Sequence, residues 1–136
     1  MKEIFMDTNP FIRYLTNDVP ERAERVENLL KKAKKGEIKL ITNELIIVEI
    51  VWVLESVYDM DKNQIYNLLQ AMFNTRNLEI SNKVILQEAS EIYKEKNIDF
   101  VDAYTVSYMK AKGFKTLCSF DKKHMRRIDW IELVEP

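Results

Sequence analysis

The sequence predicts an α/β fold in which a short, mostly parallel sheet is covered by helices on both faces. Short apolar segments with strand character alternate with longer segments of helical periodicity. This alternation is typical of crossover units, whose helices cover both faces of a parallel sheet. The expected strands are about Glu3–Met6, Ile38–Thr42, Leu78–Ile80, Lys115–Ser119 and Ile131–Val134.

The expected helices follow from apolar stripes and from end signals. The first should begin at Pro10, because proline fits the first helical position and Asn9 can cap it. Asp61 and Gln64 form the capping-box pattern ahead of a further stripe, and Val101–Lys112 should form another helix. The clearest stripes are Ala23, Val26, Leu29, Leu30 and Ala33, and then Ile65, Leu68, Leu69, Met72 and Phe73.

The only two glycines, Gly36 and Gly113, each follow a lysine-bearing helical segment and precede an expected strand. Glycine adopts the left-handed conformation that ends many helices, and cations are favourable at the negative helix end. Both glycines therefore predict helix C-termini.

The 136 residues and the 46% hydrophobic content fit a single domain spanning residues 1–136. No apolar run reaches the roughly 18 residues that span a membrane, and the N-terminus carries no signal-peptide pattern. The single cysteine, Cys118, excludes an intrachain disulfide and is expected to be a buried strand residue. We therefore expect a cytoplasmic protein without membrane contact.

The formal net charge of −1 argues against a protein that is basic overall and binds nucleic acid through its whole surface. A local basic patch would still suffice for such binding. One histidine and one cysteine cannot form a zinc site by themselves. An intrinsic metal should therefore be held by oxygen ligands, which favours Mg²⁺ or Mn²⁺.

Glu49 lies inside the apolar segment Leu45–Leu54, where an unpaired buried carboxylate would cost several kcal/mol. We expect it to be buried and to have a cation as its partner. Asp7 and Asp121 directly follow expected strands, and ligands of open α/β sheets bind at the carboxyl ends of strands. Together with Asp102, these acids predict a site for a hard metal ion.

Each acid also has a purely structural interpretation. Asp7 could form a turn with Asn9, and Asp102 could interact favourably with a helix dipole. Asp99 could cap that helix, and Asp121 could cap the short segment Lys122–Arg126. The combination of two strand-end acids with two helical acids favours the metal site over four separate structural roles.

Four cations follow Asp121 within six residues, and they could hold a phosphate backbone beside the metal. They are Lys122, Lys123, Arg126 and Arg127. His124, which lies among them, is expected to be a surface side chain.

Four short motifs resemble those of PIN-domain nucleases, in order and in spacing, over essentially the whole chain. Met6-Asp7-Thr8-Asn9 is similar to the opening motif, and Thr42 followed by Glu49 and Val53-Leu54 is similar to the second. Asp99-Phe100-Val101-Asp102-Ala103 and Ser119-Phe120-Asp121 are similar to the third and fourth. The small size resembles that of the toxins of type II toxin–antitoxin pairs.

The resemblance implies a three-layer α/β/α sandwich and a Mg²⁺- or Mn²⁺-dependent endoribonuclease that hydrolyses RNA phosphodiester bonds. Its catalytic and metal-binding residues would be Asp7, Glu49, Asp102 and Asp121. Thr8, Asn9, Ser119 and Asp99 would support the ligands or position water. Family toxins commonly form homodimers and are blocked by an antitoxin protein, so both partners are implied for this chain.

Two alternatives remain open from the sequence. A phosphatase or phosphotransferase could use the strand-end aspartate, although phosphatases of the haloacid-dehalogenase type need a second Asp where this chain has Asn9. A catalytically inactive RNA- or protein-binding module of the same fold is the other alternative, and intact acids at all four positions argue against it.

Overall fold

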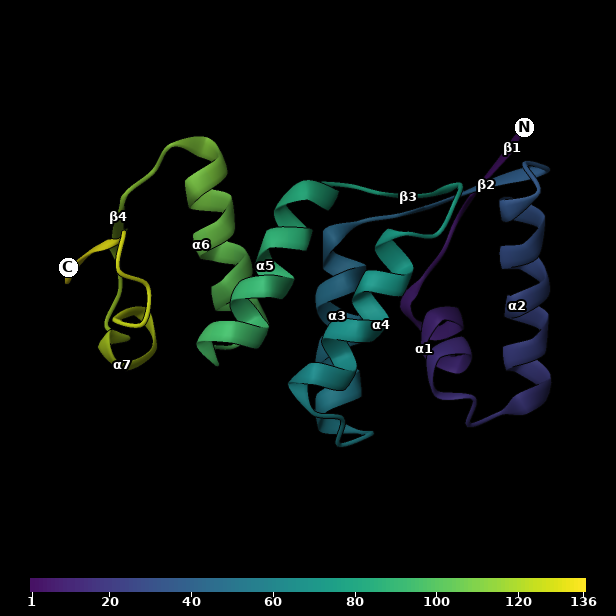
Figure 1. The fold of residues 1–136 in the computed structure, drawn as a ribbon, viewed down its shortest axis with the longest axis horizontal. Helices are drawn as coiled ribbons and strands as arrows, with labels where there is room; N and C mark the ends of the chain where they lie inside the picture. The colour runs from purple at the N-terminus through teal and green to yellow at the C-terminus, as the bar shows by residue number, and fades with distance from the viewer. The chain divides into compact units, whose positions relative to one another are not determined.

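The computed structural model describes all residues from Met1 to Pro136 and divides them into two compact units, Met1–Lys83 and Val84–Pro136 (Figure 1). Strands and helices alternate through both units. All strand pairs are parallel, so the predicted α/β class with a parallel sheet is confirmed. The expectation of a single domain stays a prediction.

The first unit contains a three-stranded parallel sheet in the order β1-β2-β3. The strands are β1 (Lys2–Phe5), β2 (Ile38–Thr42) and β3 (Leu78–Ile80). Leu40 in the central strand pairs with Ile4 on one side and with Leu78 on the other. The sequence placed β2 and β3 at these same bounds and β1 one residue later.

Four helices of the first unit bury their apolar stripes around this sheet. They are α1 (Thr8–Thr16), α2 (Pro20–Lys34), α3 (Glu44–Ser56) and α4 (Lys62–Phe73). Helix α1 packs against α2 and α3, α2 contacts β2, and α4 contacts β3. The capping box of Asp61 and Gln64 opens α4 as predicted. The fully buried side chains include Leu40, Ile47, Leu54, Ile65, Leu69 and Phe73.

Helix α1 begins two residues earlier than the sequence predicted, and its cap is Asp7 rather than Asn9. Asp7 has extended backbone angles, and its carboxylate accepts a hydrogen bond from the backbone N–H of Thr8 at 2.7 Å. Asn9 and Pro10 therefore lie inside the first turn, where a missing proline N–H costs no helical hydrogen bond. The prediction of an Asn9 cap was wrong because an acid stood two positions before it.

The second unit contains α5 (Lys83–Lys96) except for its first residue, and then α6 (Phe100–Lys112), β4 (Thr116–Cys118), α7 (Lys122–Met125) and β5 (Glu132–Val134). Helix α6 lies beside α5 (Figure 1), and the Ser107 hydroxyl donates to the Ile85 carbonyl at 3.0 Å. The Tyr93 and Phe100 rings meet edge to face at 5.5 Å. β4 pairs with β5 in parallel.

Two expectations about local structure had different outcomes. Gly113 ends α6 with a positive φ, and Gly36 follows α2 in the same conformation, so the predicted helix ends are confirmed. Cys118 is exposed, not buried. Side chains alternate along a strand, and β4 turns Leu117 inward while Thr116 and Cys118 face outward.

None of the helices is long and apolar enough to cross a membrane.

Candidate metal centre

Asp7 is fixed at the carboxyl end of β1 by the residue before it. Met6 is buried, its backbone N–H donates to the Ile41 carbonyl at 2.8 Å, and its own carbonyl accepts the Thr42 hydroxyl at 3.1 Å. Both partners of Met6, Ile41 and Thr42, lie at the end of the neighbouring strand β2. The Asp7 side chain, itself exposed, therefore starts from a rigid backbone position at the edge where parallel sheets bind ligands.

Glu49 shares a pocket with Asp7 in the first unit. It lies on α3, which starts right after β2 because Asn43 caps it, accepting from the Ile46 N–H at 3.1 Å. The pocket has a volume of about 430 Å³, and Thr8, Asn9, Arg13 and Tyr58 also line it. The two acids from the first two predicted motifs are thus brought together.

The prediction that Glu49 is buried was wrong, because its side chain is exposed. Helix α3 buries Ile47, Ile50, Val51 and Leu54, and these residues occupy one face. Leu45 and Trp52, four residues before and three after Glu49, are 73% and 64% exposed. The apolar composition of this helix therefore does not imply burial all round, and Glu49 sits on its exposed face.

The one cation in this pocket is already paired. Arg13 forms an ion pair with Asp18 at 2.8 Å, and the Tyr58 hydroxyl donates to the same carboxylate at 2.5 Å. The Tyr58 hydrogen bond is the main cause of the lowered pKa of Asp18. Neither Asp7 nor Glu49 has an ion pair, so the uncompensated charge in the pocket is negative.

Thr8 and Asn9 line the same pocket as these two acids. Thr8 is only 6% exposed, and its hydroxyl has no hydrogen-bond partner within the protein. A buried hydroxyl without a partner costs about 1–3 kcal/mol. This hydroxyl lies next to Asp7, at the wall of the pocket that Asp7 and Glu49 share.

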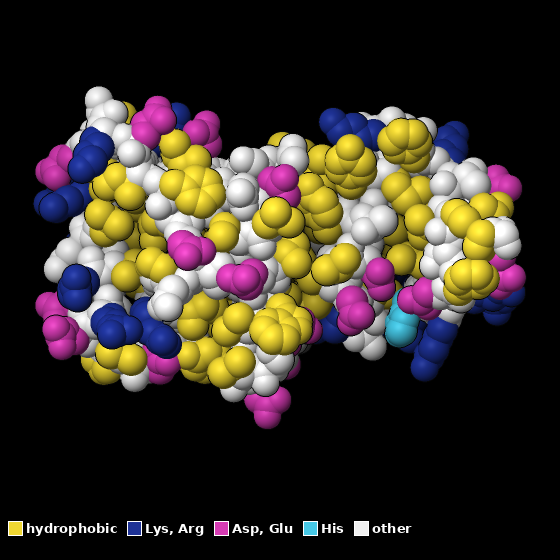
Figure 2. Space-filling view, turned by 180° about the vertical axis from the view of Figure 1, so that it is seen from behind, with side chains coloured by type: hydrophobic (Ala, Val, Ile, Leu, Met, Phe, Trp, Pro, Cys, Tyr) yellow, Lys and Arg dark blue, Asp and Glu magenta, His cyan; other side chains and the backbone are white.

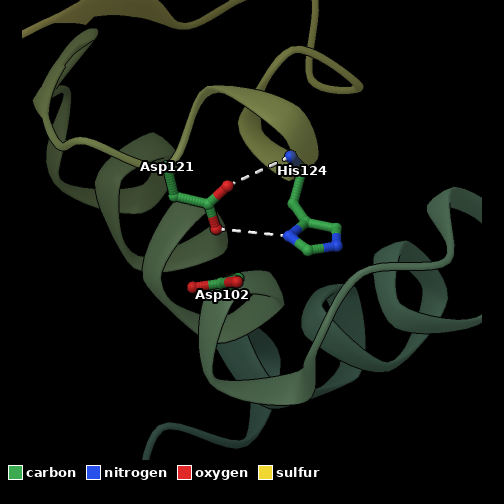
Figure 3. Close-up of side chains that lie close together, drawn as sticks. All are labelled: Asp102, Asp121 and His124. Atoms are coloured by element: carbon green, nitrogen blue, oxygen red, sulfur yellow. Dashed lines mark hydrogen bonds and ion pairs between the residues drawn. The ribbon is translucent and has the colours of Figure 1, made fainter.

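A second group of potential ligands lies in the other unit. Figure 2 shows the only histidine of the chain, His124, at the surface beside acidic side chains. Asp102 from the first turn of α6 and Asp121 from the cap of α7 point toward the same space as this imidazole (Figure 3). One ligand atom from each of the three lies within 4.8 Å of the others.

Asp121 is held by several hydrogen bonds. The Ser119 hydroxyl accepts the backbone N–H of Asp121 at 2.9 Å. One carboxylate oxygen of Asp121 accepts the backbone N–H of His124 at 3.3 Å, and the other lies 3.3 Å from His124 Nδ1 (Figure 3). The backbone hydrogen bond from His124 is the main cause of the lowered pKa of Asp121. Asp121 therefore has the capping role that was the structural alternative to metal binding, and its second oxygen is still directed at the cluster.

Asp102 has the opposite shift. Burial raises its pKa, and the charges of Asp99 and Asp121 raise it further, while His124 partly offsets them. Asp99 is the exposed N-cap residue of α6, and its side chain makes no capping hydrogen bond. Carboxylates that repel one another in this way favour a cation between them.

Two of the four cations of the predicted basic segment already have partners within the protein, and the other two have no ion pair. Lys122 pairs with Glu135 at 2.6 Å, and Arg127 donates to the backbone carbonyls of Lys96 and Asn97. Lys123 and Arg126 are exposed and have no ion pair. Those two are the cations of the segment that are free to bind a ligand.

The predicted acids thus fall into two pairs, Asp7 with Glu49 and Asp102 with Asp121, one pair in each unit. The sequence interpretation missed His124, which it treated as a surface side chain. The signal that could have found it is the spacing of Asp121 and His124, because residues three apart in a helical turn share a face.

Residues 4–131 match the family model of the PIN domain. The chain belongs to the PIN-domain family. The match covers both units and all four predicted motifs, so the resemblance drawn from those motifs is confirmed. Membership in this family confirms the α/β/α fold class that the sequence predicted.

This PIN-domain chain is also similar to a VapC ribonuclease from Aquifex aeolicus (strain VF5). The two are 27% identical over 119 residues, which cover 87% of each chain. The similarity therefore extends over most of the length of both proteins.

Proposed function

We propose that this protein is a metal-dependent endoribonuclease that hydrolyses RNA phosphodiester bonds, and that it is the toxin of a type II toxin–antitoxin pair. The observation that carries the proposal is the convergence of the acids: Asp7 and Glu49 line one pocket, and Asp102 and Asp121 converge in another cluster. Membership in the PIN family and similarity to a ribonuclease support the same activity.

The residues fit a hard divalent ion. Mg²⁺ and Mn²⁺ prefer oxygen ligands, and Asp7, Glu49, Asp102 and Asp121 would supply carboxylate oxygens. Burial raises the pKa of Asp102 and the charges of Asp99 and Asp121 raise it further, so a cation bound beside them would stabilise the charged carboxylate. When bound, such an ion lowers the pKa of a coordinated water and stabilises charge on phosphate oxygens.

The other residues of the two groups would prepare the site. Thr8, with its unpaired hydroxyl, and Asn9 would orient water beside Asp7. Ser119 fixes the backbone at Asp121 and thereby the direction of its carboxylate. Asp99 would increase the negative charge around Asp102. Lys123 and Arg126, with Lys122 and Arg127 beside them, would hold the RNA backbone.

The proposal includes two protein partners, a cognate antitoxin and a second copy of the chain. The name of the similar Aquifex protein and the small size of the chain support the toxin assignment. A cytoplasmic location is part of the same proposal and rests on the sequence alone.

The test is incubation of purified protein with a generic RNA in Mn²⁺, in Mg²⁺ and in excess chelator, with Asp7→Asn as the matched inactive variant. We expect fragments with Mn²⁺ or Mg²⁺ and none with chelator or with the variant. Hydrolysis of a small phosphomonoester without RNA cleavage would instead support the strand-end phosphatase. RNA binding without cleavage under any metal would support the inactive binding module.

A further inference from the structure

His124 lies where a metal ligand would lie. Its Nδ1 atom is 3.3 Å from a carboxylate oxygen of Asp121, and the cluster also includes Asp102 (Figure 3). Adjacent ligands of an octahedral ion with bonds of about 2.1 Å are about 3 Å apart, and opposite ligands about 4.2 Å. The distance between Nδ1 and the Asp121 oxygen is thus close to the distance between neighbouring ligands on one ion. The ligand atoms of the three residues lie within 4.8 Å of one another, so only a small movement would bring them to the spacing of ligands on one ion.

The local structure makes the imidazole available. Helix α7 has a single turn, and Asp121 caps it by accepting the backbone N–H of His124. His124 therefore contacts the Asp121 carboxylate twice, through its backbone N–H and through its ring. The His124 side chain is 39% exposed, and apart from Asp121 no group of the protein binds its ring nitrogens. Only the contact of Nδ1 with Asp121 would have to be exchanged for a bond to the ion, and the other ring nitrogen has no partner in the protein.

We propose that His124 supplies a nitrogen ligand to a divalent ion shared with Asp102 and Asp121, and that this ligand biases the site toward Mn²⁺ and similar transition ions over Mg²⁺. Imidazole suits transition metals, whereas Mg²⁺ binds chiefly oxygen. The inference rests on the proposed metal-dependent function and specifies which ion that function prefers.

The alternative role for His124 is positional: the ring would hold the Asp121 carboxylate without touching the ion. Both roles give the contact of 3.3 Å, but only one gives a bond between nitrogen and metal. The chain contains a single histidine, so an imidazole signal at a bound ion can come from His124 alone when the protein carries no histidine tag.

The decisive experiment is pulsed electron paramagnetic resonance of Mn²⁺ bound to the untagged protein. We expect a directly coordinated nitrogen coupling that changes when histidine alone is labelled with ¹⁵N and vanishes in His124→Asn. A coupling absent from the wild type, with Mn²⁺ bound, would overturn the inference. The spectrum needs no turnover, so it can be read even if the protein does not cleave RNA.

Metal affinities provide the second readout, measured by calorimetry with Mn²⁺ and with Mg²⁺. Loss of groups that only support metal ligands costs about 10–100-fold in affinity, so we expect His124→Asn to lose at least about tenfold for Mn²⁺ and much less for Mg²⁺. Lys123→Gln, which changes the neighbouring residue, should leave the ratio of the two affinities unchanged. An equal loss for both ions in His124→Asn would show a positioning role and overturn the ligand assignment.

The two proposals can fail separately. Wild-type cleavage with Mn²⁺ but without nitrogen coupling would refute the His124 ligand and leave the nuclease intact. A nitrogen coupling that depends on His124, without cleavage of any RNA, would support the ligand and refute the nuclease.

Discussion

The hydroxyl of Thr42 donates a hydrogen bond of 3.1 Å to the carbonyl of Met6, so the end of β2 fixes the residue that precedes Asp7. Thr42 is completely buried, and Met6 is 3% exposed. Since neither group is accessible to solvent, this bond couples the position of a proposed ligand to the packing of the sheet.

Thr42→Val should destabilise the protein by about 1–3 kcal/mol, because it keeps the shape but leaves the Met6 carbonyl without its partner. The shift of the Asp7 backbone should also reduce RNA cleavage. Urea unfolding and single-turnover cleavage measure the two effects. Thr42→Ser, which retains the hydroxyl, should keep more of the activity than Thr42→Val; the reverse order would mean that the bond does not position Asp7.

Asp7→Asn and Glu49→Gln should each lower RNA cleavage by at least about a hundredfold, which corresponds to about 2.7 kcal/mol of activation free energy. An amide lacks the charge with which a carboxylate binds a hard ion. Both side chains are exposed, so we expect the folds to survive, as circular dichroism would check. Glu55→Gln, on the same helix as Glu49, is the matched control. Wild-type rates in either purified variant would refute the proposed acidic site.

Divalent metal should raise the thermal midpoint of the wild type and raise it much less in Asp7→Asn. An ion that binds only the native state stabilises it by about 2.7 kcal/mol at a concentration of a hundred times its Kd. Thermal scans with increasing Mn²⁺ measure the effect. Equal shifts in the two proteins would show that Asp7 is not a ligand.

In the metal-free protein, Asp102 should contribute a loss of stability as the pH rises from about the ordinary Asp pKa of 3.8 through the raised pKa of Asp102. The folded state holds the Asp102 proton in this window while the unfolded state releases it, so the slope of stability with pH is negative for this group. Asp121, with its lowered pKa, contributes in the opposite direction.

Asp102→Asn isolates the contribution of that residue, because the variant cannot titrate there. Urea midpoints between pH 4 and pH 7 in chelator should fall less with rising pH in Asp102→Asn than in the wild type. Asp99→Asn removes one of the charges that raise the pKa of Asp102 and should give an intermediate profile. Identical pH profiles in all three proteins would contradict the coupling between these acids.

Replacing Lys123 and Arg126 together by Gln should weaken RNA binding and flatten its dependence on salt, because each phosphate contact releases counterions. These are the two cations of their segment without an ion pair, and neither lies in the metal cluster. The measurement is a binding titration at two salt concentrations, with Ca²⁺ in place of Mg²⁺. Replacing Lys32 and Lys35, at the C-terminal end of α2, by Gln makes the same change in charge and should leave binding nearly unaltered. If the two double variants behave alike, the segment after Asp121 is not the RNA contact.

The sequence predicted those parts of the fold that depend on local patterns. The bounds of β2 and β3 and the capping box of Asp61 follow from strand periodicity and from cap chemistry, and the structure has them as expected. Family membership followed from four short motifs, which are weak singly and specific together. These features require only residues close in the chain.

Features that depend on which face of an element is covered could not be predicted in the same way. Glu49 was expected to be buried because its neighbours are apolar, yet α3 also exposes Leu45 and Trp52. Cys118 was expected inside a strand, but β4 turns it outward. The ring of His124 reaches Asp121 only because a one-turn helix starts there, and composition alone does not indicate the direction of a side chain.

The exposed thiol of Cys118 makes the protein well suited to site-specific labelling. It is the only cysteine, and it lies three residues before Asp121. A fluorine-bearing maleimide would therefore attach at one position without any engineered substitution. Because Mn²⁺ is paramagnetic, an ion bound near Asp121 should broaden the fluorine resonance, whereas diamagnetic Mg²⁺ should not. The native chain thus carries its own attachment point for following metal binding in solution.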